Sequence, residues 1–383
     1  MIKIGIIGYG SRIANMFANV RAFEPDVSLA AITDPAADAV RARLVENGED
    51  AGKVHLYDDI EQMLEREPLD AVMIGTRCSL HTTMAIPVLK RGLPLFLEKP
   101  VATSFDDLKR LAAAGQASSS PVVVSFPLRV TPLVRLAREL IDSGRLGRIE
   151  HVQAFNDVPY GGVYFHSWYR DEAETGGLFL QKATHDFDYI NALLRQKPVE
   201  ICAMKSKQIF KGDKPAGLRC SECPEAQTCP EGPHAMKYIR FDDPHGDQCC
   251  FATDTGNEDS GSALIRYESG MHVSYSQNFF ARHKAARRGA RLLGYDGTLE
   301  FDWYRDEVRV MMHNTPRVET YQVDGSNMDH GGGDMVLAQN FVQVIKGKET
   351  SVAPLESGLL SAQMCLEATI SAETGTFRRI GDL

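Results

Sequence analysis

The sequence predicts an α/β protein with two parts: a doubly wound parallel sheet, then an α+β region with a mostly antiparallel sheet. Over the first 126 residues, continuous apolar runs of strand length alternate with helix-like stretches, which is typical of a parallel sheet covered on both faces. After residue 126, strand-like segments follow one another without intervening helices, which indicates antiparallel pairing with helices on one face. The length of 383 residues also suggests about two domains.

In the first part, apolar runs are predicted as strands and the stretches between them as helices. Ser104 followed by Asp107 is typical of a helix start, because these side chains can cap free backbone N–H groups. Glu24-Pro25 is expected to break the chain before a strand. The predicted strands are Ile2–Ile7, Val27–Thr33, Val54–Tyr57, Leu69–Gly75, Pro94–Leu97 and Val122–Phe126, and the predicted helices are 11–23, 36–47, 59–66, 81–91 and 104–117.

In the second part, most segments have the spacing of strands. A helix is expected over Pro132–Ser143, and Ser269-Gly270 has the chemistry of a hairpin turn. Residues 211–233 are polar and rich in Pro, Gly and Cys, so an inserted loop is expected there. The predicted strands are 148–156, 199–209, 262–268, 271–279, 297–302, 306–313 and 318–323, and the later helices are 183–195, 334–347 and 355–374.

Composition excludes several classes of protein. Hydrophobic residues make up 43% and charged residues 24% of the chain, as in ordinary globular proteins and unlike disordered ones. The formal net charge of −9 argues against a nucleic-acid partner, and the lack of a run of 18 apolar residues argues against a membrane span. The N-terminal segment MIKIGIIGYG lacks the features of a signal peptide, so a cytoplasmic location is expected.

A glycine-rich turn lies between the first predicted strand and the first helix. Gly8 would form the tight turn, and Gly10 would let a pyrophosphate approach the helix N-terminus, where free N–H groups favour an anion. Ile13 replaces the third glycine of this dinucleotide motif, which weakens the motif. Asp34 ends the second strand and could bind a ribose 2′-hydroxyl, which favours NAD over NADP. The predicted cofactor residues of this segment are Gly8, Tyr9, Gly10, Ser11, Arg12, Ile13 and Asp34.

Further motifs follow at strand ends and in later loops. Glu98-Lys99-Pro100 follows the fifth strand, at the carboxyl edge where such sheets bind ligands. Gly176-Gly177 precedes His185, and Gly331-Gly332-Gly333-Asp334 precedes a late helix. Together with the glycine turn and Asp34, these motifs resemble the Gfo/Idh/MocA (glucose–fructose oxidoreductase/inositol dehydrogenase/MocA) family over nearly the whole chain.

The resemblance implies a Rossmann domain and a second domain with an open, mostly antiparallel sheet, expected over residues 1–126 and 127–383, with a Cys-rich loop at 211–250. It implies an NAD(P)-dependent oxidoreductase for a sugar, cyclitol or related polyol, and a homodimer or homotetramer formed through the sheet. It also implies that Lys99 and His185 are catalytic. A histidine can accept the proton of a secondary alcohol and a lysine cation can stabilise the alkoxide, while nicotinamide carries the hydride.

The sequence departs from the family pattern just before His185. Family dehydrogenases often have an aspartate four residues earlier, where this chain has Gln181. Glutamine cannot act as a general base, so only hydrogen bonding to a substrate hydroxyl would remain there. Lys182 resembles a subgroup pattern with His185 and Asp188, and it could share a helix face with His185 or lie on the surface. Lys182 is therefore a third candidate catalytic residue. Asp186 would support the helix or bind substrate.

Other residues are candidates for ligand contacts, although half or more of those in the substrate group are expected to be packing residues. Trp168 and Arg170 would offer a stacking face and a donor fork to a sugar. Arg129 follows the sixth strand, where the domains are expected to meet. The remaining candidate cofactor residues are Thr76, Arg77, His81, Glu98 and Lys99. The candidate substrate residues are Arg129, Tyr160, His166, Trp168, Arg170, Gln181, Lys182 and His185.

Cysteines are concentrated in the inserted loop. A C-x2-C-x5-C pattern in a segment with little apolar content suits zinc ligation by thiolates better than core packing, and a cytoplasmic chain argues against disulfides. A closed site would fold the loop and have a structural role. The predicted zinc ligands are Cys220, Cys223, Cys229 and Cys249, with Cys250, His234 or His245 as alternatives for the fourth. An iron–sulfur cluster and reduced cysteines without metal are the other interpretations.

Two points remain open at this stage. The basic run Arg282–Arg291 is expected to be a solvated strand edge or an oligomer contact, or else to meet an acidic sugar or phosphate. The leading hypothesis is an NAD-dependent sugar or polyol dehydrogenase, or the corresponding reductase. The alternatives are a redox-neutral NAD-dependent glycosidase or lyase of the same fold, and an NAD-binding regulator without catalysis.

Overall fold

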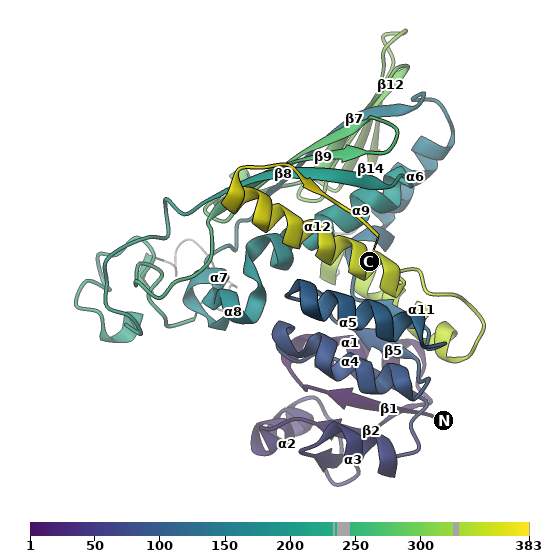
Figure 1. Ribbon diagram of the computed structural model, residues 1–383, viewed down its shortest axis with the longest axis vertical. Coiled ribbons are helices and arrows are strands. Elements are labelled where there is room, and N and C mark those ends of the chain that lie inside the picture. Colours follow the sequence, from purple (N-terminus) through teal and green to yellow (C-terminus); the bar gives the residue numbers. More distant parts are fainter. Residues whose placement is uncertain (233, 236–245, 325–328, 383) are drawn as a thin grey trace. The chain divides into compact units, whose positions relative to one another are not determined.

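A computed structural model describes residues 1–232, 234–235, 246–324 and 329–382 (Figure 1). The chain divides into two compact units. The first comprises residues 1–131 and the described part of 328–363; the second comprises the described residues between 132 and 324, with 364–382. The sequence pattern did not indicate that 329–363 belongs with the N-terminal part. Within the described ranges, no helix combines the length and apolar character needed to cross a membrane.

The first unit contains the predicted doubly wound parallel sheet. In the described residues its strand order is β3-β2-β1-β4-β5-β6, and α1 packs against α11 while α4 packs against α3 and α5. Ser104 caps α5 as predicted, since its Oγ accepts the Asp107 N–H at 3.2 Å. The strands are β1 (Ile2–Ile7), β2 (Val27–Thr33), β3 (His55–Tyr57), β4 (Ala71–Ile74), β5 (Leu95–Leu97) and β6 (Val122–Val124). The helices are α1 (Ser11–Phe23), α2 (Ala37–Glu46), α3 (Ile60–Arg66), α4 (His81–Lys90), α5 (Phe105–Gln116) and α11 (Gly333–Ile345).

A glycine on a neighbouring strand end makes room for Ile13, which stands where the dinucleotide motif has its third glycine. Ile13 is fully buried in α1. A Cβ atom added to Gly75, directly after β4, would lie 2.4 Å from the Ile13 Cβ. The close approach of helix and strand that the motif needs is therefore kept. Here the glycine that permits it is Gly75, at the strand end, and not a residue of the helix.

We expect Gly75→Ala to lower the free energy of unfolding by about 1–3 kcal/mol, because an added methyl group overpacks this contact. If Ile13 is the cause, Gly75→Ala combined with Ile13→Gly, which removes the crowded Cβ and Cγ atoms, will be less destabilised than the sum of the two single variants. Urea unfolding of the four proteins measures this coupling. Gly381→Ala is the control, since an added Cβ there meets no described atom within 4 Å. Strictly additive effects would contradict the explanation.

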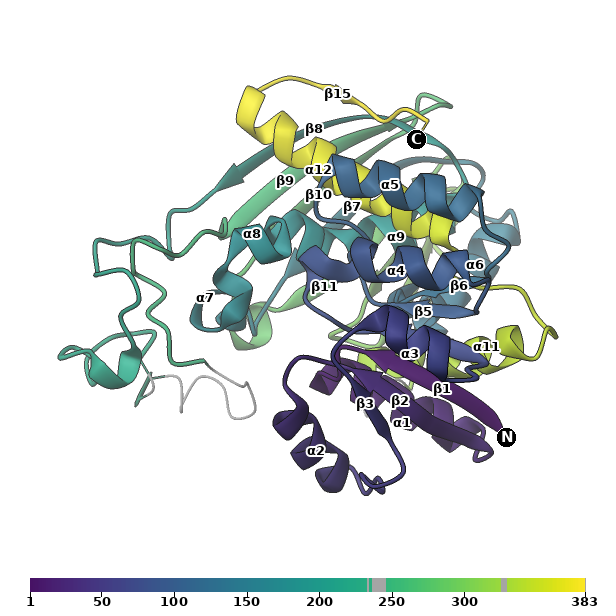
Figure 2. The ribbon, with the colours of Figure 1, turned by 60° about the horizontal axis from the view of Figure 1, so that its bottom comes forward.

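The second unit contains a mixed, mostly antiparallel sheet. In the described residues its order is β14-β13-β12-β11-β7-β10-β9-β8-β15, and β7 and β10 are parallel neighbours. Figures 1 and 2 show α6, α9 and α12 on one face of this sheet, as predicted. The strands are β7 (Ile149–Asp157), β8 (Pro198–Ser206), β9 (Ser260–Tyr267), β10 (His272–Asn278), β11 (Arg287–Gly294), β12 (Gly297–Asp302), β13 (Glu307–Met312), β14 (Val318–Gln322) and β15 (Arg378–Arg379). The longer helices are α6 (Pro132–Asp142), α9 (Thr184–Leu194) and α12 (Leu355–Thr374).

Of the two expectations favoured for the basic run, the strand edge is wrong and the oligomer contact stays a prediction. The second half of the run, Arg287–Arg291, belongs to β11, which lies in the interior of the sheet between β7 and β12. Alternate side chains of a strand point to opposite faces. Arg287 and Arg291 are therefore exposed on one face, while Arg288 is 7% exposed on the other, where Ala290 and Leu292 are also buried.

Candidate functional site

The glycine turn of the first unit has the geometry of a nucleotide-binding end. Gly8 has φ +76°, and a Cβ there would lie 2.7 Å from the Thr76 Cα. Gly10 precedes α1, and no described side chain caps the helix, so its first N–H groups face outward from the turn. Asp34 accepts the backbone N–H of Tyr9 at 2.9 Å and that of Ala36 at 2.8 Å. These bonds hold its carboxylate beside the turn, and its contact with a ribose stays a prediction.

We expect Asp34→Ser to lower kcat/KM for NAD by about ten- to hundredfold, since the variant loses a charged acceptor for the ribose hydroxyls. Removing the carboxylate also removes its repulsion of a 2′-phosphate, so the ratio of kcat/KM for NADP to that for NAD will rise. Steady-state kinetics with both cofactors measure that ratio. Asp38→Ser, in the first turn of α2, is the matched control. A cofactor ratio unchanged in Asp34→Ser would contradict this role.

Arg12 follows the glycine turn, and its guanidinium group forms ion pairs with two carboxylates. Nη1 and Nη2 contact the two oxygens of Asp334 at 2.6 and 2.7 Å, and Nε contacts Glu98 Oε1 at 2.9 Å. Burial alone would raise the pKa of Asp334, but hydrogen bonds from Arg12 and His330 hold it well below its usual value. The cluster fixes the start of α1 against the ends of β5 and the start of α11. Arg12 and Glu98, two predicted cofactor residues, thus position the turn.

A buried histidine, His81, holds the segment around Lys99. The His81 ring is 1% exposed, with Nδ1 at 2.7 Å from the Pro100 carbonyl oxygen and Nε2 at 3.2 Å from that of Thr76. Burial lowers the pKa of His81 and favours a neutral ring. His81 therefore joins the ends of β4 and β5, a bracing role that the sequence interpretation did not give it. Lys99 is partly exposed and Arg77 is exposed.

Arg129 bonds within the first unit. Its Nη1 donates to the Val352 carbonyl oxygen at 2.9 Å and to Ser357 Oγ at 3.1 Å. These bonds join the segment after β6 to the start of α12. Lys99 and Arg129 lie in this unit, whereas His185 and the other candidate substrate residues lie in the second.

In the second unit, a π-helical turn over Phe179–Ala183 leads into α9 and carries Lys182. Gly176 and Gly177 have φ of +73° and +85°, a backbone region that suits glycine. After them, Glu258 Oε1 accepts the N–H groups of Leu178 and Phe179 at 3.0 and 3.1 Å. This buried carboxylate therefore anchors the start of the turn. Single π turns often occur at functional sites.

The structure brings together two of the predicted residues, Lys182 and Tyr160. Lys182 is 5% exposed, and its Nζ lies 2.5 Å from Tyr160 Oη. Nζ also lies 5.5 Å from the centre of the Tyr164 ring. Burial lowers the pKa of Lys182, and nearby Arg288 lowers it further. Burial raises the pKa of Tyr160, but the Lys182 and Arg288 cations outweigh that effect and the pKa lies below its usual value. The pair can therefore share a proton.

A buried ion pair that the sequence analysis did not find lies beside this pair. Asp186 Oδ1 accepts from Arg288 Nε at 2.9 Å, and Oδ2 accepts from Asn156 Nδ2 at 2.8 Å and Tyr275 Oη at 2.9 Å. Asp186 is fully buried. The signal for Arg288 was present: it shares a strand face with Ala290 and Leu292, and a charged residue on an apolar face is a candidate for function.

Other predicted substrate residues bond elsewhere. Gln181 Nε2 donates to the Thr175 carbonyl oxygen at 3.2 Å, which favours a role in holding the turn. His166 Nδ1 lies 2.7 Å from the Gln248 carbonyl oxygen. Arg170 contacts Asp254 and Thr255, each at 2.6 Å, and is 4% exposed. His166 and Arg170 therefore brace the Cys-rich loop, contrary to the substrate role expected for them.

Trp168 and His185 are two further candidate substrate residues. The Trp168 ring stacks on the Tyr169 ring, with centroids 3.9 Å apart. His185 is 6% exposed and lies in the first turn of α9, three residues after Lys182. Their contacts with a substrate stay predictions.

The predicted zinc site has no support in the structure. Across the described residues, no group of three or more His, Cys, Asp or Glu side chains is arranged to hold a metal ion. Burial and the neighbouring Cys249 raise the pKa of Cys220 to about 12, which favours the neutral thiol. Cys220 Sγ instead lies 3.7 Å from the Gln248 carbonyl oxygen. Of the alternative ligands, His245 lies outside the described residues.

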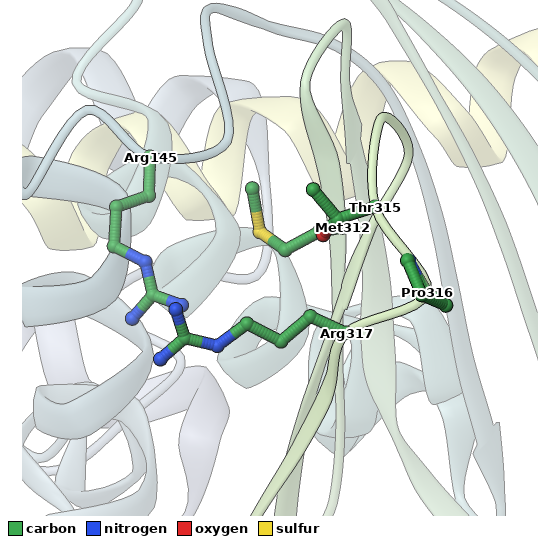
Figure 3. A pocket seen from close by; sticks show the side chains of 5 residues that line it. All are labelled: Arg145, Met312, Thr315, Pro316 and Arg317. Atoms are coloured by element: carbon green, nitrogen blue, oxygen red, sulfur yellow. The ribbon is translucent and has the colours of Figure 1, made fainter.

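A pocket of about 410 Å³ lies at the β13–β14 turn, away from these residues. Figure 3 shows two guanidinium groups facing each other across it. Both contact Glu319, Arg145 at 2.5 Å and Arg317 at 2.7 Å, so one carboxylate neutralises part of their charge. Its lining residues are Arg145, Met312, Thr315, Pro316 and Arg317.

Comparisons with known proteins agree with this architecture. The family models "Oxidoreductase family, NAD-binding Rossmann fold" and "GFO/IDH/MocA C-terminal domain" match residues 2–126 and 134–300. YteT of Bacillus subtilis, named as an oxidoreductase, is 27% identical over 319 residues, 74% of each chain. Inositol 2-dehydrogenase of Corynebacterium glutamicum is 26% identical over 202 residues, 52% of this chain and 56% of that protein. Levoglucosan dehydrogenase in complex with NADH and levoglucosan has the same fold, with a TM-score of 0.78 at 17% identity over 100% of both chains.

Proposed function

Because the chain belongs to the Gfo/Idh/MocA family of NAD-binding oxidoreductases, we propose that it transfers hydride between nicotinamide and a secondary hydroxyl or keto group of a sugar, cyclitol or related polyol. Inositol 2-dehydrogenase and levoglucosan dehydrogenase are named for such compounds. The observation that carries the proposal is the contact of 2.5 Å between Nζ of the buried Lys182 and Oη of Tyr160, which is 37% exposed.

This contact supplies a base for the proton of the reaction. Oxidation of a secondary alcohol removes a hydride from carbon and a proton from oxygen, and the nicotinamide, when bound, takes the hydride. The proton needs an acceptor whose pKa is near the working pH. Lys182 and Tyr160 both have lowered pKa values, so the pair can receive the proton at Nζ or Oη. In the reverse direction it returns the proton to the keto oxygen.

The remaining candidates take supporting roles in this proposal. The N-terminus of α1 would hold the pyrophosphate and Asp34 the ribose hydroxyls of NAD. Lys99, after β5, would stabilise negative charge on the substrate oxygen. His185, in the first turn of α9, would be a second proton acceptor.

The predicted homodimer or homotetramer would use the open face of the second sheet. Met204 on β8 and Leu264 on β9 are 77% and 51% exposed there. Large apolar side chains on neighbouring strands are suited to a contact between subunits.

The proposal is tested by incubating the protein with NAD and a panel of sugars, sugar acids, cyclitols and glycosides, while absorbance of reduced nicotinamide and formation of products are followed together. Growth of the absorbance with one class of compound is the expected result and defines the substrate. Product formation from a glycoside with constant absorbance would indicate the redox-neutral alternative. Bound NAD without turnover of any panel member, or of the matching keto compounds with NADH, would favour the regulator.

A further inference from the structure

Three polar side chains form a row across neighbouring strands of the second unit. Gln277 of β10 is paired in register with Asn156 of β7, and Asn156 is paired with Arg288 of β11. Residues paired in this way point to the same face of a sheet. All three are buried, with 2%, 1% and 7% of their surfaces exposed. The row surrounds Asp186: Asn156 and Arg288 bond to its carboxylate, and Tyr275 connects Asp186 to Gln277.

One end of the row has buried donors that are not used. Among the described residues, Arg288 Nη2 is buried and has no hydrogen-bond partner. Trp303, whose ring lies 5.9 Å from the Arg288 guanidinium carbon, has a second such donor at Nε1. A buried donor without a partner is costly, and folded proteins rarely leave two of them together. Their grouping indicates that an acceptor from outside the chain completes them.

The charges of this region favour an anion as that acceptor. Arg288 is a cation, Lys182 is a second one when it is protonated, and the buried carboxylate of Asp186 bonds to Arg288. Asp186 already accepts three hydrogen bonds through its two oxygens. One positive charge therefore remains when the Lys182–Tyr160 pair is fully protonated, the form that returns a proton to a keto oxygen. A carboxylate carries a single negative charge, whereas a phosphate carries about −1.5 to −2 at neutral pH and would leave the region with excess negative charge.

We propose that Arg288 and Trp303 bind the carboxylate of a sugar acid, so that the substrate of this enzyme is an acidic sugar and not a neutral one. A guanidinium N–H and an indole N–H can both donate to one carboxylate, and the planar guanidinium suits its shape. Lys182, in contact with Tyr160 near Arg288, would then meet a hydroxyl of the same molecule. This inference rests on the proposed oxidoreductase function and specifies the substrate class of its site.

The test compares matched pairs of neutral sugars and their acids, such as glucose with glucuronate and galactose with galacturonate. Calorimetric binding to the enzyme–NADH complex and NAD-dependent oxidation are both measured. We expect an acid to bind more tightly than its neutral partner. We expect Arg288→Gln and, more mildly, Trp303→Phe to weaken binding of the acid by about ten- to hundredfold, the usual effect of a lost charge-assisted hydrogen bond, without weakening binding of the neutral sugar.

Two controls keep the result interpretable. Arg291→Gln changes an exposed arginine on the opposite face of the same strand and should bind the acid as the wild type does. Arg288→Lys keeps the charge and the chance of an ion pair with Asp186, but loses the planar fork. It should fold normally and still lose a large part of the preference for the acid.

The inference is overturned if neutral sugars bind as well as acids, if no acid binds, or if Arg288→Lys and Trp303→Phe weaken both members of a pair equally. Oxidation of a neutral sugar with NADH formation would then leave the proposed function standing without this specificity. If no sugar or acid of any pair binds and none gives NADH, the result would contradict the proposed oxidoreductase function as well.

Discussion

Lys182→Met is expected to lower kcat by about 10²–10⁴-fold while the dissociation constant for NADH stays unchanged, since positioned acid–base groups contribute factors of this size. The lysine lies in the second unit and NADH would bind to the first, so the loss should fall on the chemical step. Stopped-flow measurement of NADH formation, together with a fluorescence titration of NADH, separates the two quantities. Lys197→Met removes an exposed lysine of the same unit and serves as control.

The pH dependence identifies which member of the pair is the base. Oxidation needs the deprotonated base, so kcat/KM falls as the pH drops through its pKa. Tyr160, Tyr164, Arg288 and Asp186 face Lys182, and Tyr160 raises the pKa of Lys182. If Lys182 is the base, Tyr160→Phe will therefore move the acid limb to lower pH with activity retained. Loss of activity at every pH in Tyr160→Phe would assign the proton to the tyrosine. A kcat of Lys182→Met within twofold of the wild type would contradict a role for the lysine in proton transfer.

Asp334→Asn is expected to lower the free energy of unfolding by about 2 kcal/mol at pH 7, because it removes one carboxylate of a largely buried ion pair. The Asp334 side chain is 2% exposed, but that of Arg12 is 34% exposed, so solvent screening keeps the loss below that of a fully buried pair. Urea unfolding of both proteins measures the difference. Asp38→Asn, on the exposed side of α2, is the control and should unfold as the wild type does.

The sign of the pH effect provides a second check on this pair. The pKa of Asp334 is lower in the folded protein than in the unfolded chain. Its contribution to stability is thus fully present above the unfolded value, near 3.9, and is lost as the pH falls through the folded pKa. The stability difference between wild type and Asp334→Asn should remain constant from pH 7 to about pH 5 and shrink below pH 4. A difference that grows on acidification would contradict the assignment.

Local patterns predicted the first unit well because its strands are buried on both faces. Ala71–Ile74 and Leu95–Leu97 are continuous apolar segments, and such segments are typical of strands in a sheet that is covered on both faces. The positions of the glycine turn and Asp34 could be predicted for a different reason, because they depend only on neighbours within one β–α–β unit. By contrast, Ile13 in place of the third glycine is explained only by Gly75, which is distant in the sequence.

Contacts between distant segments were the part that the sequence could not supply. Lys182 meets Tyr160 across 22 positions and Asp186 meets Arg288 across 102, and both pairs depend on how the strands of the second unit are ordered. His166 and Arg170 have the side chains of ligand-binding residues, yet they bond to the segment around Gln248. Residue type alone could not distinguish a side chain that stabilises a loop from one that binds a ligand. The cysteine spacing favoured a metal site, but the side chains of the described residues form no group of three or more potential ligands.

The central claim is that the protein moves a hydride from a sugar carbon to nicotinamide while the Lys182–Tyr160 pair takes the proton. It is tested most directly by a single turnover with NAD and a sugar acid deuterated at the reacting carbon, followed by mass spectrometry of the cofactor. The account predicts deuterium on the reduced nicotinamide in an amount equal to the keto product, with formation strongly slowed in Lys182→Met. Keto product formed without labelled NADH, or labelled NADH formed equally fast in Lys182→Met, would contradict it.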